Sequence, residues 1–502
     1  MLCAAPFKVA SYNVENLFDA VSDGTEYEEF IPGRHGWNAR MFEKKLAHTA
    51  EVICDLDADI IGLQEVENKN AFDALRKVLK RVGCGYRYGV ITHKKGAPIQ
   101  VALLSRFPIT QSREIEVSYA PRVRNILEVT LRIEGRPLTL FVNHWKSKSR
   151  RGYESKRIAY AKALAKRIGT MPSSKEYMIL GDLNSDYRAH LTLPKRLDDT
   201  NGKRGLSHLL HTVEGTRHLS IENLKHYPHS HYDLWLELPY RDRWSHKFYG
   251  HKSTLDHILL PASMFDGKGV DYVGGSFGVF KRDYLFTKRG YINRWQLKTG
   301  RHTGKGYSDH LPIYALFDTK PYLGSSKDHA VMPMTGTIEM LYATDKLDRP
   351  LLLQKAVVVL KRGRYAVIKQ KSEGRGVFVF GAALGLEEGH VYDLLVEDIH
   401  TYKGLKEITS MVRLKERGEV DLSAYYASFD HELRQNEVLH DLVGIYRKGY
   451  FYTGGKKIPL YFKNRRIRPQ NGTKLKIAIA HIGYYKRRQL VVYRRKDFMI
   501  LE

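Results

Sequence analysis

Six short segments of the chain place carboxylate, amide or imidazole side chains where an apolar, strand-like run begins or ends. Hydrolysis of a phosphate ester needs groups that neutralise the phosphoryl oxygens, activate a water and stabilise the leaving oxygen. Carboxylates that hold a hard cation, a histidine working with a carboxylate, and amide donors to phosphate meet these needs. The candidates, in chain order, are Asn13, Glu65, His144, Asp182 with Asn184, Asp256, and Asp309 with His310.

The first two segments predict the metal-binding part of such a site. Glu65 ends the apolar run that begins at Ile60, and a carboxylate directly after a buried strand is a good ligand for a hard metal ion. The alternative is a charge at the start of the helix that follows. Asn13 ends the first strand, where its amide is suited to orient a carboxylate, a metal-bound water or a phosphate. An asparagine in that position more often only makes a turn.

The next two segments predict groups that contact phosphate and water. His144 follows an apolar run and precedes Lys146, so we expect both side chains to bind substrate, although a lone histidine is more often structural. Gly181 lets the chain turn out of a strand into Asp182 and Asn184, whose spacing puts both side chains on one side of an extended segment. There Asp182 would accept a proton from water and Asn184 would donate to phosphate. The alternative for this pair is an Asx turn.

The last two segments open apolar strands. A charged residue such as Asp256 is unfavourable at the start of a buried strand unless it has a partner, so we expect it to bond another polar group of the site. Asp309 and His310 precede the apolar run at Ile313, and adjacent side chains reach different partners. We expect His310 to reach phosphate or water, and Asp309 to reach the metal or orient a neighbouring histidine.

Hydrophobic periodicity predicts the elements that must position these residues. Strands outnumber helices, and several are close enough in sequence to be antiparallel neighbours, which favours an α+β or two-sheet sandwich over a doubly wound parallel sheet. Weak periodicity and many His, Arg, Tyr and Asp residues in 186–251 predict active-site loops. Strands are expected at 7–12, 59–63, 101–104, 126–133, 138–142, 177–180, 255–260 and 313–317, and helices at 41–56, 71–82 and 156–168.

The six segments, in this order, resemble the endonuclease/exonuclease/phosphatase superfamily over residues 7–317. The resemblance implies a four-layer α/β sandwich with two central mixed β-sheets and a site at one edge. It implies that Glu65 is the principal metal ligand, with Asn13 beside it, and that Asp182 activates or orients the attacking water. Asn184 would be the phosphate-binding partner of Asp182, and Asp256 part of the catalytic network.

The resemblance also covers the remaining candidates. Asp309 and His310 match a terminal pair in which the histidine contacts phosphate or takes part in acid–base catalysis. His144 is similar to the middle histidine of the deoxyribonuclease-like branch, and Arg124 to the arginine before the strand that leads to it. Segments 144–148, 233–235 and 255–259 resemble bacterial secreted nucleases, a branch that commonly carries accessory nucleic-acid-binding modules.

The sequence changes character after about residue 320, where Gly, Ser, Pro and Asp gather. We expect a catalytic domain at 7–320, a linker at 321–333, a β-barrel module at 334–430 and a second, basic β-rich module at 431–502 that begins with a helical connector at 432–441. The strand pattern and segment 402–409 resemble OB-fold modules. In the second module Lys and Arg interleave with Tyr and Phe, which suits a phosphate backbone and stacked bases. An exposed basic sheet with paired tyrosines is the alternative.

The charge balance points to a polyanionic partner. The chain has 502 residues, of which 82 are Lys or Arg and 55 are Asp or Glu, giving a net charge of +27. This exceeds what solubility requires and favours DNA, RNA or an anionic membrane surface. We therefore expect a nuclease that uses Mg²⁺ or Mn²⁺, with Ca²⁺ as a further possibility, held by Glu65 with Asn13 and Asp309. The alternatives are a phosphatase or sphingomyelinase-like phospholipase of the same superfamily, or a non-catalytic nucleic-acid-binding protein.

Cysteine content and the N-terminus bear on the compartment. The three cysteines form no metal-binding pattern, and Cys54 and Cys84 are expected either to pair in an oxidising compartment or to be free thiols. Residues 1–6 are short, apolar and small, like the remnant of a secretory signal with cleavage after Ala5. No apolar run approaches the roughly 20 residues of a membrane span. We expect a periplasmic or secreted protein, with a cytoplasmic one as the alternative.

Overall fold

The computed structural model describes residues 6–149, 151–248, 251–320, 333–383, 385–429 and 433–501. The chain divides between residues 330 and 331 into two compact units. The expected signal remnant 1–6 and linker 321–333 lie, apart from Pro6 and Pro333, outside the described residues. Within the described part, no helix has the length and apolar character needed to cross a membrane.

The first sheet of the N-terminal unit is built around β1. This strand pairs in parallel with β2 on one side and antiparallel with β19 on the other. The last strand of the unit, β19, therefore lies next to the first. Helices α1 and α2 pack on its outer face. The elements are β1 (Phe7–Leu17), β2 (Ile60–Val66), β3 (Tyr88–Ile91), β4 (Gln100–Ser105), β15 (Asp271–Tyr272), β16 (Gly278–Val279), β19 (Ile313–Asp318), α1 (Ala39–Leu56) and α2 (Lys69–Arg81).

The second sheet also mixes parallel and antiparallel pairs. Strand β8 lies between β7, to which it is parallel, and β14, to which it is antiparallel. Helix α3 covers the outer face of this sheet. The elements are β5 (Ile109–Ile115), β6 (Ile126–Ile133), β7 (Arg136–His144), β8 (Tyr177–Asp182), β11 (Tyr232–Asp233), β14 (Asp256–Leu260) and α3 (Glu154–Ile168).

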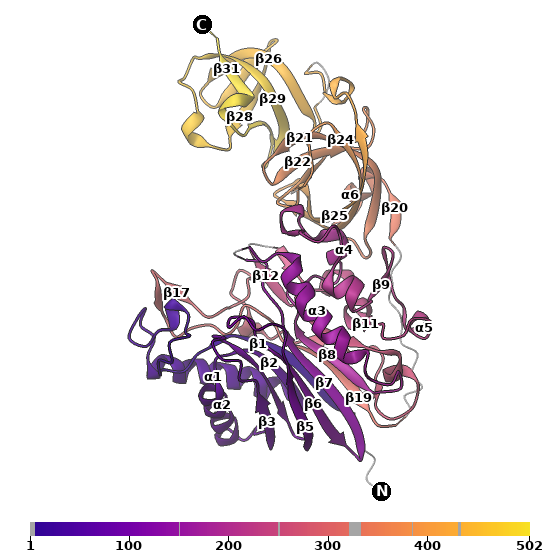
Figure 1. Ribbon diagram of the computed structural model, residues 1–502. Coiled ribbons are helices and arrows are strands. Elements are labelled where there is room, and N and C mark those ends of the chain that lie inside the picture. The colour runs from indigo at the N-terminus through magenta and orange to yellow at the C-terminus, as the bar shows by residue number, and fades with distance from the viewer. Residues whose placement is uncertain are drawn as a thin grey trace. The chain divides into compact units, whose positions relative to one another are not determined.

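The two sheets stack face to face, with the helices outside them (Figure 1). The core between them is a single cluster that contains Val9, Leu103, Leu140 and Leu180, all buried. Gly62 of β2 lets the sheets approach closely, because a Cβ there would lie 2.9 Å from Leu180 Cδ1. This arrangement of helix, sheet, sheet and helix confirms the expected four-layer α/β sandwich with two central mixed sheets.

The C-terminal unit contains two small barrels, each a closed ring of five strands. In both rings the third and fifth strands run parallel, and the first strand also pairs with the fourth, which closes the barrel. This confirms the expected small β-barrels. The first ring comprises β21 (Leu351–Arg362), β22 (Tyr365–Lys369), β23 (Val377–Val379), β24 (His390–Tyr402) and β25 (Leu405–Glu419); the second comprises β26 (Val438–Arg447), β27 (Tyr450–Thr453), β28 (Lys456–Phe462), β29 (Lys474–Tyr484) and β30 (Arg488–Val492).

The predicted helical connector at 432–441 is wrong. Strand β26 begins at Val438, and the described residues before it, from 433, contain only a turn at Gln435 and Asn436. Val438 and Leu439 are both fully buried, on opposite faces of the strand, and pairing with β29 outweighs the helix-forming composition of this segment. Strand β26 ends at Arg447, and a turn at Lys448 and Gly449, which both have positive φ, leads into β27.

Cys54, near the end of α1, and Cys84, just after α2, form a disulfide with a Cα–Cα distance of 5.7 Å. That distance is typical of disulfides. The bond closes a loop with a sequence separation of 30 residues and ties the two outer helices together.

We therefore predict that reduction destabilises the protein. Closing a loop of this size stabilises a fold by about 2–4 kcal/mol, so a reductant should lower the melting temperature of the wild-type chain. The double variant Cys54→Ser, Cys84→Ser should already melt lower and should not respond to the reductant. Thiol titration of the denatured, unreduced chain provides the check, and titration of all three cysteines there would contradict the bond.

Candidate active site

Three strand ends of the second sheet meet in register at one edge. His144 is the last residue of β7 and lies opposite Asp182, the last residue of β8. Asp182 in turn lies opposite Asp256, the first residue of β14. All three side chains are buried. The sequence placed these residues at strand ends, and the register of the sheet brings them side by side.

The first sheet contributes Asn13 and Glu65 through two adjacent irregularities. The pairing of β1 with β2 shifts between Asn13 and Leu17, and the pairing of β2 with β4 shifts between Gln64 and Val66. Glu65 itself has a φ of 66°, in the left-handed region. Bulges of this kind re-aim side chains next to active sites. Here they direct Asn13 and Glu65 toward the strand ends of the opposite sheet.

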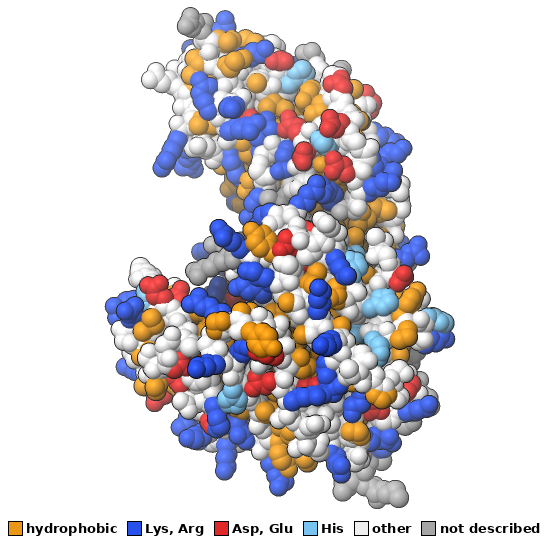
Figure 2. Space-filling view, in the orientation of Figure 1, with side chains coloured by type: hydrophobic (Ala, Val, Ile, Leu, Met, Phe, Trp, Pro, Cys, Tyr) orange, Lys and Arg blue, Asp and Glu red, His pale blue; other side chains and the backbone are white. Residues whose placement is uncertain are grey.

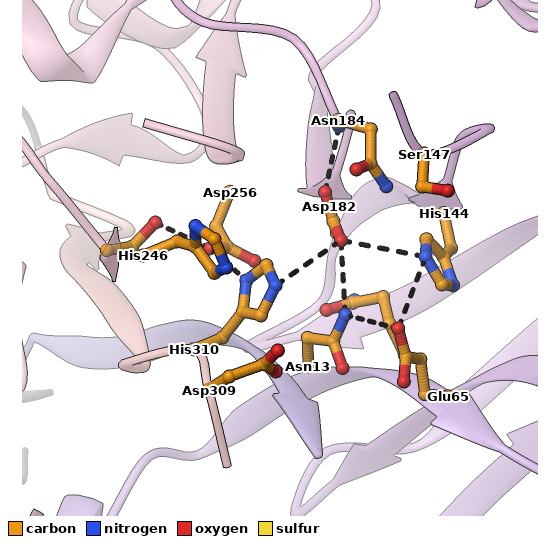
Figure 3. Close-up of polar contacts among 12 residues, drawn as sticks. Asn13, Glu65, His144, Ser147, Asp182, Asn184, His246, Asp256, Asp309 and His310 are labelled. Carbon is orange, nitrogen blue, oxygen red and sulfur yellow. Dashed lines mark hydrogen bonds and ion pairs between the residues drawn. The ribbon is translucent and has the colours of Figure 1, made fainter. Parts of the chain in front are cut away.

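The Asn13 amide joins the two sheets. Its Nδ2 donates to Glu65 Oε1 at 3.0 Å and to Asp182 Oδ2 at 3.1 Å, while its Oδ1 accepts from the Glu15 amide (Figure 3). The other Glu65 oxygen accepts from the Asn16 amide at 3.0 Å. Burial, followed by the nearby Asp309, raises the pKa of Glu65 above its usual range. The amide thus holds together two carboxylates that would otherwise repel one another.

His310 is held as an imidazolium. Its Nδ1 donates to Asp256 Oδ2 at 2.8 Å, and its Nε2 lies 3.8 Å from Asp182 Oδ2. Although burial opposes the charged form, the carboxylates of Asp256 and Asp182 outweigh it and raise the pKa of His310 well above its ordinary value. Ser245 also donates to Asp256, at 2.5 Å. The expectation that Asp256 needs a partner is met by this pair of bonds.

Asp182 is suited to take a proton at neutral pH. Burial raises its pKa to about 7, with the like charge of Asp256 adding to the effect and His310 opposing it. A carboxylate whose pKa is close to the working pH is a more effective general base than an ordinary, weakly basic one. Its second oxygen accepts from the Asn184 amide N–H at 2.8 Å, which orients the carboxylate.

His144 has the opposite character from His310. Burial, together with the positive charges of Arg124, His310 and Lys146, lowers its pKa well below its ordinary value, so the ring is neutral. Its Nε2 lies 3.6 Å from both Glu65 Oε1 and Asp182 Oδ2. The site therefore offers one charged and one neutral imidazole on either side of Asp182.

Two of the expected substrate-binding side chains are engaged with the backbone. Arg124 donates from Nε to the His144 carbonyl at 2.7 Å and from Nη2 to the Trp145 carbonyl at 2.8 Å. Asn184 Nδ2 donates to the same Trp145 carbonyl at 3.1 Å. Both residues therefore fix the chain that carries His144. Their contact with phosphate, like that of half-buried Lys146, stays a prediction.

Sequence reasoning missed four polar residues of the site. Arg294 is bound to Glu15 and lies 3.5 Å from Asp309, so it connects that carboxylate to the bulge of β1. The ring of His246 lies with its centroid 4.8 Å from that of His310. Ser245 holds Asp256, and Ser308 donates to the Asn13 carbonyl at 2.7 Å. His246 opens the short strand β12 (His246–Phe248), and the other three lie in loops, where no periodicity marks them. Only the density of polar residues in 186–251 pointed toward some of them.

The donor set fits a divalent cation. Ligand atoms of Glu65, His144 and Asp182 lie within 4.8 Å of one another, as do those of Asp182, Asp256 and His310. Among the described residues, Asp256 Oδ1 and His144 Nδ1 are buried without a hydrogen-bond partner. Several buried carboxylates and unsatisfied polar atoms at one point are what a cation would compensate.

Asp309 was expected beside Glu65 as a metal ligand, but its neighbours differ from those of Glu65. It groups with His246 and His310, within the same 4.8 Å limit, rather than with Glu65. Although burial opposes the charged form, His310 and Arg294 lower the pKa of Asp309, so it is an anionic carboxylate. Its assignment as a ligand stays a prediction.

Residues 8–319 match the model of the Endonuclease/Exonuclease/phosphatase family. The match covers more than half of the chain, and the protein therefore belongs to this family of hydrolases. The N-terminal unit is accordingly a phosphodiesterase or phosphatase, of a kind that generally uses divalent metal ions. No curated protein matches the chain.

Solved structures are similar to part of the chain. The crystal structure of D. rerio TDP2 complexed with single strand DNA product is 16% identical, covering 63% of this chain and 100% of that one, with a TM-score of 0.39. That of SmcL is 17% identical, covering 62% and 99%, with a TM-score of 0.38. A family protein from Leptotrichia buccalis is 14% identical, covering 62% and 99%, with a TM-score of 0.38.

The geometry predicts that Gly181→Ala disables the site. Gly181 has a φ of 130°, and a Cβ there would lie 2.0 Å from the Asn143 carbonyl oxygen on β7. Strand β8 must then move away from β7, which displaces Asp182 from His144. We expect a destabilisation of about 2–4 kcal/mol and a loss of kcat of about a hundredfold, measured by thermal unfolding and phosphodiester hydrolysis.

Gly202→Ala is the matched control. Gly202 also has a positive φ, of 81°, but no atom lies within 4 Å of the added Cβ. It should be destabilised by no more than about 1 kcal/mol and retain its activity. Equal behaviour of the two variants would contradict the role given to the contact between β7 and β8.

Proposed function

We propose that the protein is a divalent-metal-dependent endonuclease that hydrolyses phosphodiester bonds in DNA or RNA. The observation that carries the proposal is the Asn13 amide shared between Glu65 and Asp182. It sets a candidate metal ligand and a candidate base next to each other, at the edge where both sheets end.

Each side chain then has a part in the reaction. Glu65, with Asn13 and Asp309 nearby, would hold Mg²⁺ or Mn²⁺, which supplies positive charge to the phosphoryl oxygens when bound. Asp182 accepts the proton of the attacking water, as its pKa of about 7 allows. His310, anchored by Asp256, donates from Nε2 to the developing negative charge.

Neutral and backbone-fixed groups complete the phosphate contacts. The His144 ring is neutral, so it can donate a hydrogen bond to phosphate without repelling the cation. The charged His310 ring would repel a cation. Asn184 and Lys146 would bind the phosphate from the loops after β8 and β7, and Arg124 would contribute positive charge behind them.

The charge of the chain supports a polymeric substrate. The net charge of +27 is distributed widely, and Lys and Arg outnumber Asp and Glu on the visible face (Figure 2). Positive charge spread over a protein surface binds the phosphates of a long polyanion and contributes little to a single small ester.

The second barrel of the C-terminal unit supports the same partner. On the outward side of β26, β27 and β28, Ile445, Tyr452 and Lys457 lie opposite one another in register. Tyr452 is 39% exposed and Tyr461 is 40% exposed. An OB-like barrel that presents tyrosines beside lysines is suited to stack bases and neutralise phosphates.

The disulfide supports export. Cys54 and Cys84 are bonded, and disulfides persist chiefly in oxidising compartments. We therefore propose a periplasmic or secreted enzyme.

Glu65→Gln tests the catalytic assignment. The variant keeps the size of the side chain and removes its charge, so activity should fall by at least about a thousandfold with Mg²⁺ or Mn²⁺, equivalent to several kcal/mol of transition-state stabilisation. The activity of His310→Gln should fall by a similar factor. Circular DNA, linear DNA, RNA and sphingomyelin, digested in parallel, define the substrate.

Glu43→Gln, an exposed residue of α1, is the matched control and should keep full activity. Cleavage of sphingomyelin but of none of the nucleic acids would overturn the nuclease proposal and leave the phosphodiesterase intact. Full activity of Glu65→Gln would overturn the catalytic assignment itself.

Tyr452→Ala tests the contribution of the second barrel. Loss of one stacking side chain weakens single-strand binding by about 1–3 kcal/mol, so KM for a polynucleotide should rise about tenfold while kcat on a small phosphodiester is unchanged. Tyr119→Ala, at a 92% exposed tyrosine of the catalytic unit, is the control. An unchanged KM in Tyr452→Ala would remove this face from the proposal.

A further inference from the structure

A second group of carboxylates lies apart from the active site. Asp23 and Glu26 belong to the loop after β1, and Glu67 follows the end of β2. One carboxylate oxygen of each lies within 4.8 Å of the others, in a group that shares no residue with the active-site groups. Glu67 is buried, Glu26 half-buried and Asp23 exposed, so the group opens to solvent on one side only.

The Glu67 side chain has an unsatisfied oxygen within this group. Glu67 is only 2% exposed, and its Oε2 accepts from the Asp19 amide at 2.7 Å. Its Oε1 is buried and has no hydrogen-bond partner among the described residues. Buried polar atoms are nearly always paired, and the other two members of the group are carboxylates, which only accept hydrogen bonds when they are ionised.

The loop is folded so that its own amides hold the other two carboxylates in place. Glu26 accepts from the amides of Asp23 and Gly24, and Asp23 Oδ1 accepts from the amide and hydroxyl of Thr25. These bonds orient the side chains without supplying a positive charge. Three carboxylates at such distances repel one another when they are ionised, and a cation is the group that would reverse the sign of that interaction.

We propose that Asp23, Glu26 and Glu67 form a second divalent-cation site, selective for Ca²⁺. The donors are all oxygens, which suits a hard cation. A group of several carboxylates without octahedral symmetry suits Ca²⁺, which accepts varied coordination geometries, better than Mg²⁺, which demands near-ideal octahedral geometry. The exposed side at Asp23 leaves room for water ligands.

Such a cation would be structural. It would fasten the loop after β1 to the end of β2, just beyond the bulge that aims Glu65. The same loop continues into the buried aromatic cluster of Phe18, Phe30 and Trp37. Calcium would therefore raise the melting temperature through Glu67 and leave the chemistry to the other site.

Calcium stoichiometry tests the site in the full-length protein. Equilibrium dialysis with ⁴⁵Ca²⁺ is compared for the wild type, Glu67→Gln and Asp23→Asn, with Glu28→Gln as the matched control. Glu28 is exposed, lies at the start of the short helix η1 (Glu28–Phe30) two residues after Glu26, and is outside the group. We expect Glu67→Gln and Asp23→Asn each to bind one Ca²⁺ fewer than the wild type, and Glu28→Gln to bind as many.

The thermal response to calcium is the second measurement. Calcium should raise the melting temperature of the wild type and of Glu65→Gln, and should raise it much less in Glu67→Gln. Retention of the wild-type number of calcium ions by both Glu67→Gln and Asp23→Asn would overturn the proposal. If Glu67→Gln does not fold, Asp23→Asn decides, since its side chain is exposed. The comparison uses differences from the wild type, so it is independent of whether Glu65 binds a metal.

Discussion

Two carboxylates from different sheets, the buried Asp182 and the half-buried Glu65, share one amide group, and the active site depends on this contact. Asn13 Nδ2 donates to Glu65 on its own sheet and to Asp182 on the other. Without that donor the two carboxylates would repel each other across a buried edge. The contact also defines how the two sheets must align, since β1 and β8 lie near the centres of their sheets. The alignment of the two sheets that packs the core is therefore the same alignment that sets the geometry of the site.

The electrostatics of the site follow from the different neighbours of its two imidazoles. His310 lies against Asp256 and near Asp182, so its pKa is raised, while His144 lies among positive groups, so its pKa is lowered. Asp182 lies between them, and its pKa of about 7 is close to neutral pH. Environments that separate the pKa values of neighbouring groups assign acid and base roles without any change of residue type.

Sequence alone predicted most of the strands of the two central sheets, and it placed His144, Asp182 and Asp256 at the strand ends where they lie. Asn13, expected at the end of the first strand, lies inside β1, which continues to Leu17. An apolar run ending in Glu65 or Asp182 marks both the strand and its functional end. Bulges were not predictable, because the left-handed φ of Glu65 occurs at a residue that carries no local signal for it. Ser245, Ser308 and Arg294 were missed for a related reason, since loops place them through tertiary contacts. The prediction of a helix at 432–441 was wrong because pairing of β26 with β29 outweighs the local helix propensity.

The central claim is that the edge joined by Asn13 binds a divalent cation through Glu65. Anomalous diffraction from crystals soaked in Mn²⁺ tests it directly, because the signal locates the ion without reference to activity. We predict an anomalous peak in coordination contact with the Glu65 carboxylate, next to Asp182, that disappears in Glu65→Gln crystals. Ordered crystals at saturating Mn²⁺ with no peak at Glu65 would contradict the account.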